Sequence, residues 1–253
     1  MSGGRFDGVS VLVTGGGRGI GRAVVAAFLG EGARVATCGR GARPGDLAAA
    51  VAWHRVDVSD ALAVEAMVTA VAAAQGAPRV LVNNAGAQVE KTLPESTDAD
   101  WDLVIGANCR GVFHCCRAVL PGMADGGAIV NIGSISGHLA DPGMALYNAS
   151  KAFVHGLTRS IAVDHGPQVR CNAVSPGWIE TGMADAAFAL AEDPAAAKRD
   201  ALARHAVRRF GRPEDIAQAV LWLSGPEAAF VTGQCLTVDG GLTAASPLQP
   251  GLF

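Results

Sequence analysis

The sequence predicts a doubly wound α/β fold, in which a mostly parallel, seven-stranded sheet lies between two layers of helices in a single domain. Short runs rich in β-branched residues alternate with segments of helical periodicity along most of the 253 residues. Half of the residues are apolar and only 17% are charged, which suits a well-packed core. Neither an internal repeat nor a linker-like stretch interrupts the alternation, so we expect one domain over residues 1–253.

Composition and charge exclude several classes of function. A net charge of −3 provides no basic field for nucleic acid. The longest apolar runs are shorter than a membrane span, and the first residues lack an apolar signal core. We therefore expect a soluble, cytoplasmic protein with neither a membrane nor a nucleic-acid partner.

The cysteines and histidines do not form a recognisable metal motif in the sequence. The six cysteines include no CxxC pair, and the six histidines show neither HxxxH nor HExxH spacing. We expect no metal, and we expect the cysteines to be small buried apolar side chains in a reducing compartment.

The chain begins with a strand, a glycine-rich turn and a helix. The apolar run 9–13 is followed by Thr14-Gly15-Gly16-Gly17-Arg18-Gly19-Ile20-Gly21, and helical periodicity then continues to Leu29. Glycines allow the backbone to turn sharply and to approach a pyrophosphate, whose charge is favoured at a helix N-terminus. An ordinary tight turn between strand and helix is the alternative interpretation.

The end of the second strand, at 34–38, bears on the choice of dinucleotide. A carboxylate at this position binds the ribose 2′-hydroxyl of NAD, whereas a nearby arginine suits the 2′-phosphate of NADP. This chain has Gly39 and then Arg40 here, with Arg18 in the first loop. NADP is therefore favoured over NAD, unless Arg40 is a solvated loop residue.

The middle of the chain continues the alternation up to a long helix. In order, we expect a loop over 41–50 that passes into an alanine-rich helix, a third strand over 51–56 before Asp57-Val58, a helix over 60–74, and a fourth strand over 80–82 before Asn83-Asn84-Ala85-Gly86. A helix over 101–120 follows, and it carries Asn108 midway. Asparagine is a poor interior helix residue, so Asn108 either faces solvent or has a specific role.

The rest of the chain supplies three more strands. We expect strands over 128–132, 169–174 and 236–238, helices over 146–163 and from 213 onward, a helical flap over about 183–209 that covers a substrate pocket, and an irregular tail over 242–253. The fifth strand leads directly to Gly133-Ser134.

Tyr147 and Lys151 form the pair on which the functional prediction rests. Tyr147 is the only tyrosine, and residues four apart on a helix share a face. A phenol titrates near ~10, and lowering its pKa to about 7 requires about 4 kcal/mol of differential interaction. A fixed ammonium beside the ring acts in this direction, and a cationic ring would add to it. The alternative is an amphipathic residue at a helix start next to a solvated lysine.

Taken together, these motifs resemble those of the short-chain dehydrogenase/reductase family, over residues 6–241. They occur in one order: Thr14-Gly-x-x-x-Gly-x-Gly21, Asp57-Val58, Asn83-Asn84-Ala85-Gly86, Asn108, Gly133-Ser134, Tyr147-x-x-x-Lys151 and Pro176-Gly177. The thirteen-residue spacing from Ser134 to Tyr147 also matches, which favours Ser134 over Ser136. The resemblance implies a Rossmann-type fold and an enzyme that uses NADP, with NAD possible, to interconvert a carbonyl and an alcohol.

The resemblance also implies roles for individual residues. Tyr147 would be the general acid in reduction, Ser134 would bind the substrate oxygen, Lys151 would bind the nicotinamide ribose and lower the pKa of Tyr147, and Asn108 would hold a water that links Lys151 to bulk solvent. The cofactor would be held by Gly15, Arg18, Gly19, Ile20, Gly21, Gly39, Arg40, Asp57, Val58, Asn84, Ala85, Gly86, Pro176, Gly177, Ile179 and Thr181, together with Tyr147 and Lys151.

The substrate is less constrained by the sequence. Its pocket would be lined by His138, Leu139, Met144, Trp178, Met183 and Phe188, in addition to Ser134 and Tyr147. A 3-oxoacyl-thioester reductase is one possibility, a sugar or cyclic-alcohol dehydrogenase another, and a non-catalytic nucleotide-binding protein a more distant one. We also expect a homo-oligomer, usually a tetramer in this family, assembled through the helices at 101–120 and 148–163.

Overall fold

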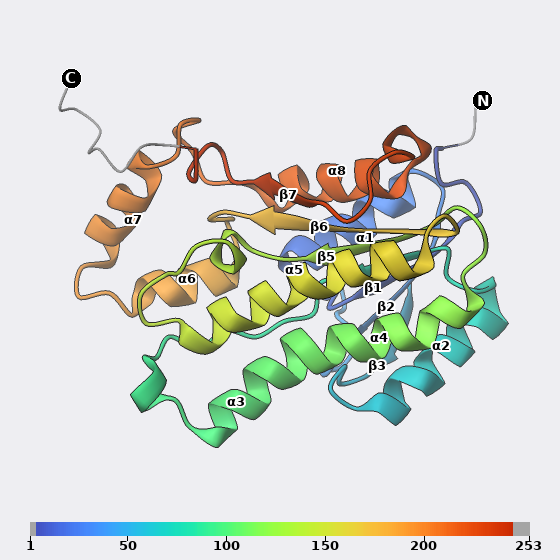
Figure 1. Ribbon diagram of the computed structural model, residues 1–253, viewed down its shortest axis with the longest axis horizontal. Helices are drawn as coiled ribbons and strands as arrows, with labels where there is room; N and C mark the ends of the chain where they lie inside the picture. The colour runs from blue at the N-terminus through green and yellow to red at the C-terminus, as the bar shows by residue number, and fades with distance from the viewer. Residues whose placement is uncertain (1–3, 245–253) are drawn as a thin grey trace.

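The computed structural model describes residues 4–244, so that residues 245–253 of the expected tail lie outside the described part of the chain. Its centre is a parallel sheet of seven strands in the order β3-β2-β1-β4-β5-β6-β7 (Figure 1). The strands are β1 (Ser10–Thr14), β2 (Arg34–Gly39), β3 (Ala52–Arg55), β4 (Val80–Asn83), β5 (Gly127–Ile132), β6 (Val169–Pro176) and β7 (Cys235–Val238). The doubly wound fold predicted from the sequence is confirmed.

Helices cover both faces of the sheet. Helices α1 (Gly19–Gly30) and α8 (Pro213–Ser224) pack together on one face, whereas α2 (Ala61–Gln75), α4 (Gly111–Val119) and α5 (Ala145–His165) cover the other (Figure 1). The remaining helices are α3 (Asp98–Ile105), α6 (Gly182–Ala189), α7 (Pro194–Ala203) and the short turns η1 (Leu93–Glu95), η2 (Gly106–Arg110), η3 (Leu120–Gly122), η4 (Ile135–Gly137) and η5 (Pro226–Ala228).

Successive side chains of β1 point to opposite faces of the sheet, so that β1 contributes to the core on both sides. Val11 and Val13 face the layer of α1 and α8, and Leu12 faces the layer of α2, α4 and α5. All three side chains are fully buried. Truncating a buried leucine of this kind to alanine typically costs about 2–5 kcal/mol of stability, so β1 anchors both halves of the fold.

The alanine-rich segment before β3 is not a helix, so this sequence-based prediction is wrong. Residues 45–51 form turns. The Arg43 guanidinium donates hydrogen bonds to the carbonyl oxygens of Leu47, Ala48 and Val51. The Arg43 side chain thus bonds carbonyl oxygens that would accept hydrogen bonds within a helix. In a stretch this short, helix propensity alone does not offset the free-energy cost of helix nucleation.

The long helix predicted over 101–120 is interrupted at its centre. Its segments α3 and α4 are joined by the π-helical turn η2, in which Asn108 is 1% exposed. By length and mean hydropathy the continuous helical segment Asp98–Gly122 could cross a membrane, but half of its apolar stretch is buried within the protein. It packs against α2 and α5 as a core helix of this domain does.

Helices α6 and α7 stand at one end of the sheet, on the left in Figure 1. Each begins with a side-chain cap, from Thr181 and Asp193 respectively. They enclose a small apolar cluster of Phe188, Ala201 and Phe210, separate from the two main clusters. The segment is therefore helical, as expected, and its role as a flap stays a prediction.

Candidate active site

The predicted catalytic side chains meet where β4 and β5 end. Ser134 follows β5, Tyr147 and Lys151 lie in the first two turns of α5, and Asn108 lies in η2. The carboxyl ends of parallel strands form the crevice in which doubly wound folds bind ligands. The structure therefore brings together four residues that are up to 43 positions apart in the sequence (151 − 108 = 43).

Lys151 is held by the backbone of β5. Its ammonium donates a 2.8 Å hydrogen bond to the carbonyl oxygen of Ile132 and lies 5.5 Å from the centre of the Tyr147 ring. The residue is 6% exposed, and burial lowers the pKa of the Lys151 ammonium to about 8. The ammonium is thus fixed near the phenol, as the spacing of four residues predicted.

The pKa of Tyr147 is raised in the protein alone, whereas the sequence-based reasoning expected it to be lowered. Burial is the main cause that raises it to about 12, the Ser134 hydroxyl acts in the opposite direction by hydrogen bonding, and the charges of Asp141 and Glu90 contribute to the rise. With a pKa of about 8, Lys151 is mostly protonated at neutral pH, and it becomes neutral before the pH at which the phenol ionises. The phenol is consequently a proton donor throughout the neutral range.

A chain of hydrogen bonds leads away from Ser134. The Ser134 hydroxyl donates to Ser136 Oγ at 3.0 Å, and the Ser136 hydroxyl donates to Asp141 Oδ2 at 2.6 Å. The Ser136 amide in turn donates to Ser134 Oγ at 3.1 Å. Asp141 thereby fixes the direction of both hydroxyls. Sequence analysis considered Ser136 only as an alternative to Ser134 and missed Asp141, since no motif marks it.

Asn108 links the loop after β4 to α5. Its side-chain oxygen accepts from the Ala87 amide at 2.8 Å, and its NH₂ group donates to the Ala87 carbonyl and to Ser150 Oγ, each at 2.9 Å. Ser150 Oγ donates to the Tyr147 carbonyl at 2.8 Å. The side chain thus clamps the backbone around Tyr147, and its predicted part in holding a water stays a prediction.

The glycine-rich loop is shaped so that its amides stay available. Gly15 and Gly19 have positive φ values of 69° and 53°, and a Cβ on Gly21 would come within 2.4 Å of Asn84 Nδ2. The amides of Gly19 and Gly21, at the start of α1, make no hydrogen bond within residues 4–244, and α1 has no side-chain cap. Free amides at a helix N-terminus fit the pyrophosphate of a dinucleotide.

The loop is supported from below by polar contacts. Thr37 Oγ1 accepts from the Gly16 amide at 3.0 Å and donates to the Val13 carbonyl at 2.6 Å. The Asn84 side chain donates to the carbonyl oxygens of Thr14 and Gly15. Thr37 and its role were not identified from the sequence, because its signal is a buried hydroxyl in a strand.

The end of β2 is basic. Arg18 and Arg40 are exposed, and Arg55 donates to the Arg40 carbonyl at 3.0 Å. Asp57 is hydrogen-bonded by Ser59, and these bonds together with the Arg40 charge hold its pKa below the usual value although burial acts to raise it. Arg55 is a third cation at this position that sequence analysis did not single out.

An indole ring limits the space beside this basic group. A Cβ on Gly39 would lie 2.7 Å from the Trp53 ring, and one on Gly17 would lie 3.3 Å from it. The close approach of the Trp53 ring therefore favours glycine at position 39. Val58, which follows Asp57, is buried against Gly111 of α4.

The segment after β6 reaches back to the glycine loop. Pro176 closes β6, and a Cβ on Gly177 would lie 2.8 Å from that of Asp239. Ile179 is buried, and Thr181 caps α6 and lies against Gly19, where an added Cβ would be 3.4 Å from its methyl group. The predicted pyrophosphate and carboxamide segments are thus neighbours.

The predicted substrate residues separate into two groups. The rings of Trp178 and Phe188 stack at 4.5 Å in the small cluster of α6 and α7. His138 is exposed and its ring lies 4.3 Å from that of His155, while Met144 is buried. Met183 and Leu139 are exposed, at 43% and 56%.

A cavity of about 500 Å³ opens beside α7 rather than at Tyr147. It is lined by Glu180, Ala195, Lys198, Arg199, Leu202, Arg208, Arg209 and Phe210.

Known proteins are similar to this chain in sequence and in structure. Residues 15–243 match the model of a family described as enoyl-(acyl carrier protein) reductase. The chain is 37% identical to 3-oxoacyl-[acyl-carrier-protein] reductase FabG of Thermotoga maritima over 94% of this chain and 99% of that one. It is 40% identical to 2-(S)-hydroxypropyl-CoM dehydrogenase 3 of Xanthobacter autotrophicus over 92% and 96%. The solved structure of ligand-free Thermoplasma acidophilum aldohexose dehydrogenase is similar with a TM-score of 0.90, at 34% identity over 97% of both chains.

Proposed function

Since the chain belongs to the short-chain dehydrogenase/reductase family, we propose that it is an NADP(H)-dependent oxidoreductase that reduces a carbonyl compound to a secondary alcohol. That it is an oxidoreductase acting on carbonyl or CH–OH groups follows from the family. The observation that supports this site is the convergence of Tyr147, Ser134 and Lys151 at the end of β5.

The residues of the crevice suit each part of the cofactor. The amides of Gly19, Ile20 and Gly21 would hold the pyrophosphate, with the turn shaped by Gly15. Val58 and Asp57 would border the adenine, while Asn84, Ala85 and Gly86 would border the ribose region. Pro176, Gly177, Ile179 and Thr181 would hold the carboxamide. When bound, the nicotinamide supplies or accepts the hydride.

Residues of the protein would transfer the proton to the substrate oxygen. Tyr147 is a neutral phenol at physiological pH and can give its proton to the substrate oxygen, because its pKa in the protein is about 12. Ser134 would turn its hydroxyl from Ser136 Oγ, to which it donates in this structure, and donate instead to the same substrate oxygen as charge develops there. Lys151 would bind the nicotinamide ribose, and Asn108 keeps the backbone around Tyr147 in place.

The preference for NADP rests on the cations at the end of β2. Arg40 and Arg18 are exposed, and Gly39 contributes no carboxylate that would repel a phosphate. A paired titration with NADPH and NADH, followed by nicotinamide fluorescence, tests this proposal. Tight NADPH with weak NADH supports it, tighter NADH overturns the cofactor preference, and binding of neither overturns the site itself.

For the substrate we propose a 3-oxoacyl thioester first, in line with the relative from Thermotoga maritima. A polyhydroxylated substrate is the second candidate, because Asp141 and Glu90 place carboxylates near Tyr147 that could accept hydroxyl hydrogen bonds. Rates with an oxoacyl thioester and NADPH, compared with rates with aldohexoses and NADP⁺, distinguish the two.

We also propose that the protein is cytoplasmic, and we propose a homotetramer because apolar side chains are exposed on two faces. One face carries Trp101, Phe113 and Phe153 of α3, α4 and α5, exposed by 50%, 42% and 42%. Trp222 and Phe230, exposed by 38% and 105%, lie on and just after α8. Patches of this kind mark association surfaces. Light scattering of the wild type and of Phe153→Arg tests the assembly, and a monomeric wild type overturns it.

A further inference from the structure

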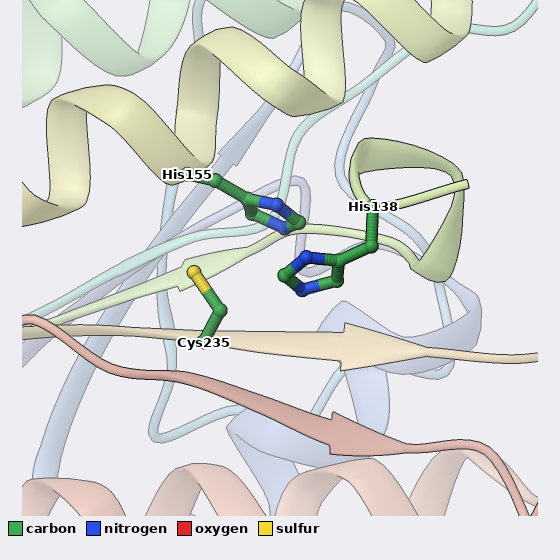
Figure 2. Close-up of side chains that lie close together, drawn as sticks. All are labelled: His138, His155 and Cys235. Carbon is green, nitrogen blue, oxygen red and sulfur yellow. The ribbon is translucent and has the colours of Figure 1, made fainter. Parts of the chain in front are cut away.

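Two histidines and a cysteine meet beside the catalytic helix. His138 lies after η4, His155 lies on α5 one turn beyond Lys151, and Cys235 begins β7. One nitrogen of each imidazole and the Cys235 sulfur all lie within 4.8 Å of one another. Figure 2 shows the two rings facing each other with the sulfur to one side. The sequence gives no hint of this cluster, because its members are 17 and 80 positions apart (155 − 138 and 235 − 155).

His155 has an unused ring nitrogen in a buried place. The residue is 3% exposed, its Nε2 lies 3.0 Å from Ser175 Oγ, and its Nδ1 has no hydrogen-bond partner within residues 4–244. Buried polar atoms without a partner are rare and call for an explanation. The free nitrogen of this ring is therefore available to a further ligand in a cluster whose other members lie within 4.8 Å.

The two other residues can adjust their positions. His138 is exposed in the loop that follows η4, and Cys235 is partly exposed at the start of an edge strand. The ligand atoms of a tetrahedral zinc ion lie about 3.5 Å apart, given bonds of about 2.0–2.1 Å to nitrogen and 2.3 Å to sulfur. Rotation of the His138 and Cys235 side chains can bring atoms now within 4.8 Å to such distances.

We propose that His138, His155 and Cys235 form a zinc site. Imidazole nitrogen and thiolate sulfur are the ligands that Zn²⁺ prefers, and three protein ligands with a solvent-facing fourth position make a complete coordination sphere. One ring nitrogen of His155 binds the ion while the other keeps its proton, the tautomer that metal-binding histidines adopt.

Zinc binds cysteine as the thiolate. Binding converts the Cys235 thiol to a thiolate, so that one proton leaves for solvent and the site gains one positive charge. No redox change occurs.

Zinc at this position would join three parts of the active site. It would tie the loop after Ser134 to the helix that carries Tyr147 and Lys151 and to the edge strand β7. His138 would then be withdrawn from the substrate pocket that the sequence assigned to it. Zinc binding is therefore expected to stabilise the protein against heat, independently of the substrate.

The test uses the reduced, untagged full-length protein and two ions. Co²⁺ is titrated in place of Zn²⁺, because its absorption reports a sulfur ligand and the coordination number, and Zn²⁺ affinity is measured by competition with a chromophoric chelator. The variants are Cys235→Ser and His138→Ala, both at positions that are not fully buried. The matched control is His165→Ala, at the far end of α5 and outside the cluster.

We expect one equivalent of Co²⁺ with a thiolate charge-transfer band, and a zinc-dependent rise in Tm. Loss of a supporting group around a metal typically lowers affinity about 10–100-fold, so loss of a ligand should lower it by at least about tenfold in each variant. His165→Ala should bind as the wild type does. No saturable binding to the wild type, or wild-type affinity in either His138→Ala or Cys235→Ser, overturns the proposal.

Discussion

The ionisation of Tyr147 can be measured directly, because it is the only tyrosine in the chain. Absorbance of tyrosinate against pH then reports this one phenol, without a contribution from any other. Burial raises its pKa from 10.0 to about 12, and a shift of about 2 units corresponds to about 2.7 kcal/mol against the charged form. In the folded protein at pH 11, about a tenth of the phenol should be ionised. In the chain unfolded by guanidinium, about nine-tenths should be ionised.

The sign of the accompanying stability change follows from the same shift. Because the folded-state pKa is raised, the stability from the neutral phenol is fully present below about pH 10 and is lost as the pH rises through about 12. Lys151 acts in the opposite direction: its pKa is lowered to about 8, so its contribution is lost as the pH falls from about 10.5 through 8. Circular dichroism recorded at each pH shows over which range the protein stays folded.

Lys151→Met separates the two possible roles of the ammonium. If Lys151 is already neutral above about pH 8, the variant and the wild type should show the same tyrosinate curve in the absence of cofactor. Tyrosinate appearing below about pH 9 in the wild type, and shifting upward in Lys151→Met, would refute the order of titration argued above. Addition of NADP⁺ should move the wild-type curve to lower pH, because a cation favours phenolate.

Three further substitutions test other parts of the site. Arg40→Ala should weaken NADPH binding about tenfold to a hundredfold while NADH binding changes little, since hydrogen bonds to charged groups contribute about 1.5–3 kcal/mol. Arg117→Ala is the control. Equal losses of affinity for both dinucleotides would speak against a contact between Arg40 and the 2′-phosphate. Asp141→Asn should lower the pKa of Tyr147, by up to about one unit, because it removes a negative charge that raises it; an unchanged pH–rate profile would show that Asp141 does not act on the phenol. Thr37→Val should lower the urea midpoint with the m-value unchanged, because it leaves the buried Gly16 amide unpaired. The expected loss of unfolding free energy is about 1–3 kcal/mol. An unaltered midpoint would mean that this hydrogen bond is dispensable.

Patterns that are local in sequence predicted the fold well. The apolar run of β1 and the glycines after it are contiguous, and a strand followed by such a turn has few other structures available. The 48–51 segment shows the limit of this reasoning. Alanine propensity is a small energy per residue, and the hydrogen bonds from Arg43, which the sequence does not reveal, outweigh it.

Contacts between distant segments were not predictable, because they depend on strand order. Cys235 comes near His155 only because β7 pairs with β6, which places Cys235 opposite Ala173 on the face that α5 covers. The same holds for Arg55, which reaches the Arg40 backbone through the pairing of β3 with β2. A single sequence carries no signal for such pairings.

For the Tyr147–Lys151 pair, sequence spacing predicts that the two side chains lie close together, whereas burial determines their pKa values. The separation of four residues predicted that the ammonium would lie near the ring, and it does, at 5.5 Å from the ring centre. Spacing could not predict the depth at which the pair sits, and depth sets both pKa values, one to about 12 and the other to about 8. A buried ammonium and a partly buried phenolate each lose hydration, so without a further charge the neutral pair is favoured near pH 9. Without cofactor, Tyr147 therefore keeps its proton, which is the state that reduction of a carbonyl requires. Oxidation of an alcohol requires a further positive charge near the ring, because such a charge favours the phenolate.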